Sequence, residues 1–343
     1  MAIRGKIFVA LLLVLTLVAL TPAFAGEKEK LGDAWWTGPL QTPSPNTIPK
    51  NHWYVETYFA VEQDNGVYAN NGTKYGANNA FRGSGYDNDY QSTTLFTYGV
   101  TNKFNLQMLL GADGAQGGTA FVSGGKVQNP SSNGVEINTF RVRLPYNVLK
   151  FKQGGAPLSF AVVPEVNTPM SAGAIWTPGF GLWVQRPFWM PTGRILRIRA
   201  SEDIWFPKGG KTVDNTGAGT TALSATCLAN SMCSKDAAKY GVTQVGFEYS
   251  LTKKWVPAFD FVWKYYGLNN FNGSNAIGPA TFAANGATLT TGKLAGRRDF
   301  RVDPALEYNF TENTGIIFGV EVTVAGTNTG SYIAPQIALQ WFK

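Results

Sequence analysis

The sequence is poor in the residues that most catalytic and metal sites need. Its 343 residues include one histidine and two cysteines. Nucleophilic catalysis of the Ser–His–Asp type needs a base beside a nucleophile, and a zinc site needs several Cys or His ligands. The histidine, His52, has no serine motif near it, and the cysteines, Cys227 and Cys233, have no second pair. We therefore expect a protein that is not an enzyme and that holds neither a metal ion nor a cofactor.

Charged residues are scarce as well. Asp, Glu, Lys and Arg make up 15% of the chain, whereas an ordinary soluble domain is about 25% charged. The formal net charge of +7 is mild, and no basic run accompanies it, which argues against a nucleic-acid partner. What the chain has instead is 39 Gly, 22 Phe, 14 Tyr and 10 Trp. This composition favours an all-β protein.

The N-terminus predicts secretion. Two cations within Met1–Lys6 precede the apolar run Ile7–Leu20, and the small residues of Ala23-Phe24-Ala25 precede a cleavage site before Gly26. The run is shorter than the roughly 20 residues that a membrane-spanning helix needs. Residues 1–25 are therefore expected to be a signal peptide, and no later apolar stretch is long enough to span a membrane as a helix.

Twelve stretches of the mature chain read as β-strands. In residues 301–310, Arg301, Asp303, Glu307 and Asn309 fall on one face of an extended chain, and apolar side chains fall on the other. Such a period of two indicates a strand whose faces meet different surroundings. The expected strands are 52–62, 91–101, 104–112, 135–146, 157–167, 176–188, 194–205, 244–251, 255–265, 301–310, 315–325 and 331–342.

The connections between these strands alternate in length. Short turns such as TN, MPTG, TKK and FTENT alternate with connections that are mostly long and rich in Gly, Asn, Ser and Thr, at 63–90, 113–134, 206–240 and 266–297. A soluble sandwich has no reason to gather its tight turns at one end, whereas a bacterial barrel has short periplasmic turns and long external loops. We therefore predict a single transmembrane antiparallel up-and-down β-barrel of about 12 strands over residues 51–343, in the bacterial outer membrane.

Three details of this barrel are open to test. Prolines inside the expected strands should lie at strand ends or bulges, because proline cannot donate to a ladder. Tryptophans near strand ends should form aromatic girdles. In the oxidising compartment, Cys227 and Cys233 should form a disulfide within one loop. The prolines are Pro164, Pro178, Pro257, Pro304 and Pro335, and the tryptophans are Trp176, Trp189, Trp205, Trp255, Trp263 and Trp341.

If the apolar faces meet lipid, the polar faces line a lumen. Twelve strands enclose more space than the roughly eight whose side chains just fill the interior, so a narrow channel is plausible. For any single residue, an ion pair that only holds the barrel round is the alternative interpretation. The expected pore lining is Glu56, Arg197, Arg199, Glu248, Asp260, Lys264, Arg301, Asp303, Glu307 and Glu321, with Arg141, Arg143, Glu165 and Asp203 on the same face.

Two stretches of the chain are similar to a known family. TGPLQTPSPNTIPKNHWYVETYF at residues 37–59, followed by YGVTNKFNLQ at residues 98–107, resembles the outer-membrane transporter-like family of the MetA-pathway of phenol degradation. Asn51 stands where that family usually has glycine. The resemblance implies a secreted barrel, often associated with uptake of aromatic compounds, and it carries no catalytic motif.

Residues 26–50 precede the first strand and are rich in proline. They read either as a flexible or polyproline-like periplasmic tail or as a plug, in which Trp35 and Trp36 fold back into the lumen. The plug hypothesis is motivated by two adjacent tryptophans that would otherwise remain in water.

The predicted function is passive uptake of small solutes, aromatic or hydrophobic compounds among them. The expected partners are outer-membrane lipid and lipopolysaccharide, the solute and the barrel-assembly machinery. Three alternatives remain open: a structural or surface-binding barrel with a sealed lumen, a membrane-embedded lipid hydrolase that uses His52, and a secreted soluble β-sandwich.

Overall fold

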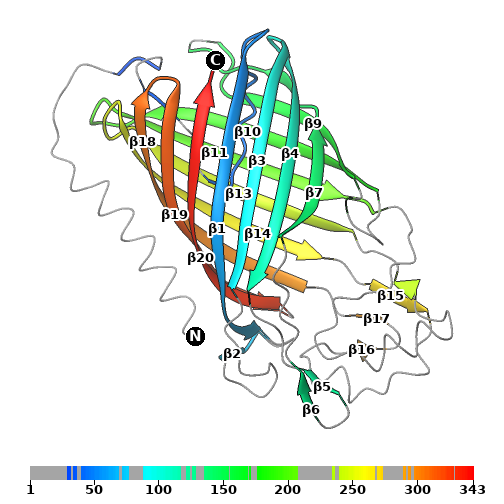
Figure 1. Ribbon diagram of the computed structural model, residues 1–343. Coiled ribbons are helices and arrows are strands. Elements are labelled where there is room, and N and C mark those ends of the chain that lie inside the picture. Colours follow the sequence, from blue (N-terminus) through cyan, green and yellow to red (C-terminus); the bar gives the residue numbers. More distant parts are fainter. Residues whose placement is uncertain are drawn as a thin grey trace.

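The computed structural model (Figure 1) describes most of the expected barrel and part of the segment before it. The predicted signal peptide and the predicted Cys227–Cys233 disulfide lie outside the described residues. No helix among the described residues is long and apolar enough to cross a membrane. The described residues are 29–31, 34–36, 40–68, 72–76, 88–116, 121–123, 126–128, 135–153, 155–168, 170, 176–207, 234–235, 239–266, 269–272, 289–290, 293–294, 297–327 and 329–343.

The chain forms a closed antiparallel barrel of 12 strands, as predicted. Each strand pairs with the next along the chain, and the last, β20, pairs with the first, β1, so that no edge is left open. The ring is β1 (Trp53–Tyr68), β3 (Asn88–Thr101), β4 (Phe104–Gln116), β7 (Val135–Arg143), β9 (Ser159–Thr168), β10 (Thr177–Trp189), β11 (Ile195–Trp205), β13 (Tyr240–Tyr249), β14 (Trp255–Tyr266), β18 (Arg297–Thr311), β19 (Thr314–Thr327) and β20 (Thr329–Phe342).

Short strands accompany the ring. The crossing that begins with β7 continues, after Leu144-Pro145, as β8 (Tyr146–Leu149), which also pairs with β9. The remaining short strands lie in the connections between barrel strands: β2 (Lys74–Gly76), β5 (Phe121–Ser123), β6 (Lys126–Gln128), β12 (Ser234–Lys235), β15 (Asn269–Asn272), β16 (Leu289–Thr290) and β17 (Lys293–Leu294).

The two ends of the barrel differ. At what we call the short-turn end, the strands are joined by residues 102–103, 150–158, 190–194, 250–254 and 312–313. The N–H of Trp53 donates to the carbonyl of Lys343 there, at 2.8 Å, so the barrel strands begin and end side by side. The opposite, long-loop end carries the connections 69–87, 117–134, 169–176, 206–239 and 267–296. The short strands β2, β5, β6 and β15 to β17 lie towards it in Figure 1.

The barrel is polar inside and apolar outside. In β18, Asp303 and Glu307 are fully buried, whereas Leu306 and Phe310 are 41% and 50% exposed. The neighbouring Phe318 of β19 is 49% exposed. A soluble β-sandwich would bury these apolar side chains between its sheets, so the closed ring with this polarity excludes the sandwich interpretation.

The in-strand prolines lie where a ladder ends or is interrupted, and none of them sits at a bulge. Pro178 and Pro257 lie one residue beyond the ladders with β11 and β13. Pro304 pairs with β14 and Pro335 pairs with β19, whereas the ladder on the other side of each proline is interrupted there. Pro164 faces the break between β7 and β8. Each missing N–H therefore coincides with a site where no ladder bond is required.

The tryptophans do not all point outward, and Trp189 and Trp205 correct the girdle prediction: Trp189 donates to Glu29 of the segment before the barrel. Trp176, Trp255, Trp263 and Trp341 are 57%, 42%, 45% and 41% exposed on the outer face. Trp205 is only 2% exposed, because it shares the inward parity of Arg197, Arg199 and Asp203 along β11. It therefore belongs to the lumen.

Candidate lumen site

The described residues between 29 and 50, namely 29–31, 34–36 and 40–50, belong to a segment that enters the barrel at the short-turn end; we call it the segment of residues 29–50. Glu29 anchors it there: its carboxylate lies 3.3 Å from Nη1 of Arg194 and accepts a hydrogen bond from Ser250 Oγ at 2.8 Å. The indole N–H of Trp189 donates to the Glu29 carbonyl at 2.8 Å. The segment is thus tied to the turns between β10 and β11 and between β13 and β14.

The two tryptophans of this segment meet cations of the barrel. The guanidinium of Arg197 lies 4.3 Å from the ring centre of Trp36, and Nζ of Lys253 lies 5.6 Å from that of Trp35. Asn309 Nδ2 donates to the Trp35 carbonyl at 3.2 Å. Cation–π contacts and a backbone hydrogen bond therefore hold this part of the segment.

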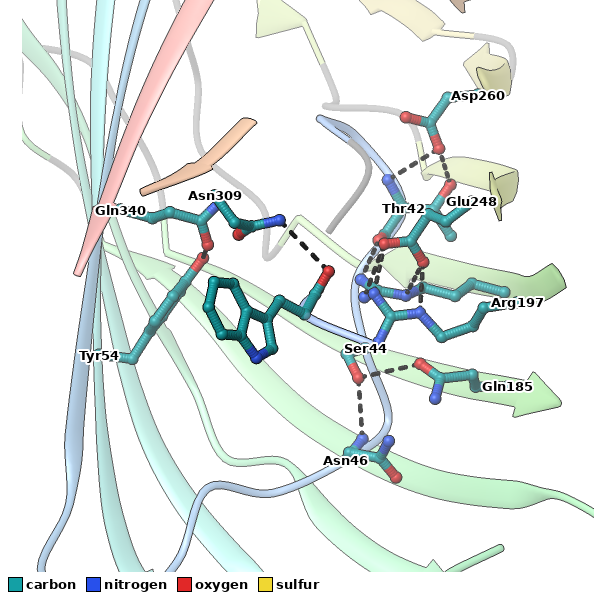
Figure 2. Close-up of polar contacts among 12 residues, drawn as sticks. Thr42, Ser44, Asn46, Tyr54, Gln185, Arg197, Glu248, Asp260, Asn309 and Gln340 are labelled. Atoms are coloured by element: carbon teal, nitrogen blue, oxygen red, sulfur yellow. Dashed lines mark hydrogen bonds and ion pairs between the residues drawn. The ribbon is translucent and has the colours of Figure 1, made fainter. Parts of the chain in front are cut away.

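Asp260 receives the innermost part of the segment. Its carboxylate accepts the N–H of Gln41 at 3.1 Å, the N–H of Thr42 at 3.3 Å and the Thr42 hydroxyl at 2.5 Å. Figure 2 shows Thr42 facing Asp260. In return, Arg199 donates to the Thr42 carbonyl at 3.3 Å, and Gln244 donates to the Gln41 carbonyl at 2.9 Å.

A small apolar contact lies at the same depth. Leu40 is 5% exposed and packs with Ile317 and Ala338. Gly319 makes room for it, since a Cβ there would overlap the end of the Leu40 side chain. Asp260 is the sixth residue of the twelve-residue β14, so the segment reaches about halfway along that strand.

The segment then returns to the end at which it entered. Ser44 donates to Gln185 at 3.3 Å, and Asn147 donates to the Pro45 carbonyl at 2.8 Å. Thr47 donates to the carbonyl of Asn102, in the turn between β3 and β4, at 2.7 Å. The segment is therefore a loop with both of its ends at one mouth of the barrel.

The two stretches that carry the family resemblance contact each other. The N–H of Asn51 donates to the Gly99 carbonyl at 2.8 Å, and a Cβ on Gly99 would overlap the Pro49 carbonyl oxygen. Asn51 has a φ of 64°, a conformation that glycine and asparagine adopt most easily. Asn51 is therefore one of the residue types best suited to this backbone position.

Several of the predicted lining residues pair with one another in the interior. Glu248, fully buried, binds Arg197 and lies 3.0 Å from Arg199. Arg301 lies 2.6 Å from Asp299 and 2.9 Å from Glu321. Such buried pairs need their partners, because a lone charge away from water is costly.

The remaining predicted residues are also placed inside. Asp303 is the register partner of Asp260 and accepts a hydrogen bond from Gln336 at 2.6 Å. Glu307 is fully buried. Glu56, which is 5% exposed, and Lys264 both lie against the lumen cavity.

Charges of both signs lie on the lumen wall, but they are unevenly distributed over it. Arg141 and Arg143 lie on β7, and Arg197 and Arg199 lie on β11. Acidic residues concentrate on β14, β18 and β19, with Asp260, Asp303, Glu307 and Glu321. The ring order separates these two groups of strands. Neither group is of one sign, because Lys264 and Arg301 lie on β14 and β18, and Asp203 lies on β11.

A cavity of about 880 Å³ remains between the segment and the wall. It touches Thr42 and Ile48 of the segment and, on the barrel, Glu56, Arg141, Lys264 and Glu321. A cavity of this size matches those that hold small molecules. Among the described residues, no group of three or more His, Cys, Asp or Glu side chains is placed to hold a metal ion.

Neutral residues do much of the binding of the segment, and the sequence interpretation did not single them out. Asn102, Asn147, Gln185 and Gln244 each contact it through an amide or a carbonyl. Gln185 and Gln244 occupy inward positions of the alternating pattern, and this position could have identified them as lumen residues. The predicted pore lining was selected by charge and therefore did not include these neutral residues.

Comparison with solved structures agrees with this architecture. No protein-family model and no curated protein matches the chain. The COG4313 outer membrane channel from Pseudomonas putida F1 is 11% identical, with a TM-score of 0.57, over 90% of this chain and 100% of that one. The chain shares the fold of that channel.

Two further barrels were found with lower scores. The toluene transporter TbuX of Ralstonia pickettii is 11% identical over 86% of this chain and 90% of its own, with a TM-score of 0.34. The KdgM porin is 10% identical over 83% of this chain and 98% of its own, with a TM-score of 0.38.

Proposed function

We propose that this chain is a passive channel of the bacterial outer membrane that admits small solutes, aromatic or hydrophobic compounds among them. The supporting observation is a cavity of about 880 Å³, lined by charged residues, inside a barrel whose outer face is apolar. By analogy with barrels that have short periplasmic turns, the short-turn end faces the periplasm. The finer affiliation with the phenol-degradation family, implied by residues 37–59 and 98–107, is part of this proposal.

We further propose that the segment of residues 29–50, with Trp35 and Trp36, acts as a plug that narrows the lumen. Deleting residues 26–50 is expected to raise single-channel conductance in planar bilayers, since the contacts of Leu40, Gln41 and Thr42 would leave the middle of the lumen. A Gly/Ser spacer of equal length in place of residues 26–50 is the matched control for chain length. Unchanged conductance in both variants would reject the plug.

The sealed barrel is the main competitor. It predicts no ion current from the purified full chain and none from the deletion variant, although both insert into the bilayer. A measurable current from either protein argues against it.

The hydrolase alternative finds little support in the surroundings of His52. The imidazole is exposed, with Nδ1 3.0 Å from the Lys50 carbonyl, and it stacks on Phe342 at 5.5 Å between ring centres. Lipid turnover that is abolished by His52→Ala would favour the hydrolase over the channel.

A further inference from the structure

A cluster of polar and aromatic side chains from β7, β9, β11 and β13 lines the lumen, near the long-loop ends of β9, β11 and β13. It consists of Arg141 on β7, Asn167 on β9, Trp205 on β11 and Tyr240 on β13. Arg141 Nε donates to Asn167 Oδ1 at 2.5 Å, and Asn167 Nδ2 donates to the Tyr240 hydroxyl at 3.0 Å. Arg141, Trp205 and Tyr240 all line the cavity of about 880 Å³.

The charge of Arg141 sets it apart from the arginines around it. Arg143, Arg197, Arg199 and Arg301 each form an ion pair with a carboxylate. Within the described part of the chain, the hydrogen-bond partner of Arg141 is the neutral amide oxygen of Asn167. A guanidinium has five N–H donors, so the two terminal nitrogens of Arg141 remain available on the cavity side.

The aromatic part of the cluster is preassembled. The rings of Trp205 and Tyr240 stack at 4.9 Å between centres, with 19° between their planes, and the Arg141 guanidinium lies 4.8 Å from the Trp205 ring centre. Gly179 allows this placement, because a Cβ there would lie 2.5 Å from Cδ1 of Trp205. Trp205 is 2% exposed, and its indole N–H has no hydrogen-bond partner among the described residues.

We propose that Arg141, Trp205 and Tyr240 form a subsite of the channel that binds a small aromatic carboxylate. A guanidinium matches a carboxylate with two parallel hydrogen bonds. Tyr240, which is partly exposed, supplies flat apolar contact for an aromatic body, and Trp205 packs against Tyr240 and Arg141 and orients them. This inference rests on the proposed channel function and names the class of solute that the lumen selects.

Titration calorimetry of the full chain in detergent, with sodium benzoate at constant ionic strength, tests the subsite. The unaltered protein is expected to bind benzoate, and Arg141→Gln is expected to weaken binding at least about tenfold through the loss of a charge-assisted pair. Arg186→Gln is the matched control: it removes the same charge from an exposed side chain outside the cavity lining, and it should bind benzoate like the unaltered protein. Equal affinity in Arg141→Gln would overturn the proposal.

A second variant and a second carboxylic acid test the aromatic part of the subsite. Trp205→Leu removes the ring that orients Arg141 and Tyr240 but keeps an apolar side chain, and a several-fold loss of benzoate affinity is expected. Cyclohexanecarboxylate has the same charge without an aromatic face, so it should bind more weakly than benzoate. Equal binding of these two acids would overturn the aromatic specificity.

Failure of this inference can be told apart from failure of the channel proposal. A KCl current through the deletion variant together with no benzoate binding rejects the subsite and leaves the channel. Benzoate binding without any current in any variant rejects the channel on which the subsite's role in uptake depends.

Discussion

Asp260 accepts three hydrogen bonds from two consecutive residues of the lumen segment, two of them from backbone N–H groups. Among the described carboxylates of the barrel, none accepts more hydrogen bonds from this segment. Because its side chain is fully buried, water cannot easily replace those bonds when the segment is in place. Asp260 is thus the principal attachment of the segment to the wall.

Asp260→Ala is expected to release the segment from the wall. Loss of the charge-assisted bonds should weaken the docked state by about 2 kcal/mol, which is a factor of roughly thirty in its equilibrium constant. Bilayer recordings should show higher conductance or more frequent opening. Glu202→Ala is the control, because Glu202 bonds to Thr243 and Tyr265 and does not contact the segment. Identical traces for both variants would contradict this assignment.

Gly99→Ala should act on the return path of the segment. The added Cβ would overlap the backbone oxygen of Pro49, which cannot swing aside like a side chain. We expect faster proteolysis within residues 40–50, by mass spectrometry of limited digests. Gly155→Ala, which meets only Lys152 side-chain atoms at 3.5 Å or more, should leave the digestion pattern unchanged. Equal protection in both variants would argue that the segment does not depend on this contact.

At the scale of elements, the positions of the strands in the sequence were largely predictable, but the register between neighbouring strands was not. A period of two located the crossing strands and told inside from outside in β14, β18 and β19. It did not predict the break at Leu144-Pro145 or the extension of β1 to Tyr68, since these depend on neighbouring ladders. The same limit applies to the site: parity predicted that Arg197 and Glu248 face inward, but only the register brings them together.

The proline of β20 provides a test at this scale. At Pro335 the ladder with β1 is interrupted. Ile337, two residues further along, pairs with Phe59 of β1 and with Phe318 of β19. Ile337→Pro should therefore remove a ladder bond and impair closure, whereas Pro335→Ala should be close to neutral. Heat-modifiable migration on SDS gels reports closure. Normal migration of Ile337→Pro would show that this ladder position is not needed.

At the scale of the whole molecule, the outer face determines where the barrel is stable. Phe318 and Leu306 are register partners on this face and are 49% and 41% exposed. Phe318→Arg should reduce the free energy of folding into lipid bilayers by about 2 kcal/mol, because a cation would meet hydrocarbon. Urea titration of the protein in vesicles measures this change. Gln153→Arg adds the same charge in an exposed turn and should have little effect; equal losses would contradict a lipid-facing position for Phe318.

The segment of residues 29–50 leaves the barrel at the mouth by which it entered. A strand drawn through the whole pore would have to be threaded, and removing it would mean pulling a free end along the entire length. A loop that doubles back needs no threading. It can leave the lumen as one piece while the hydrogen bonds between β1 and β20 remain intact. An open and an obstructed form of the same closed cylinder could therefore interconvert with no unzipping of the wall.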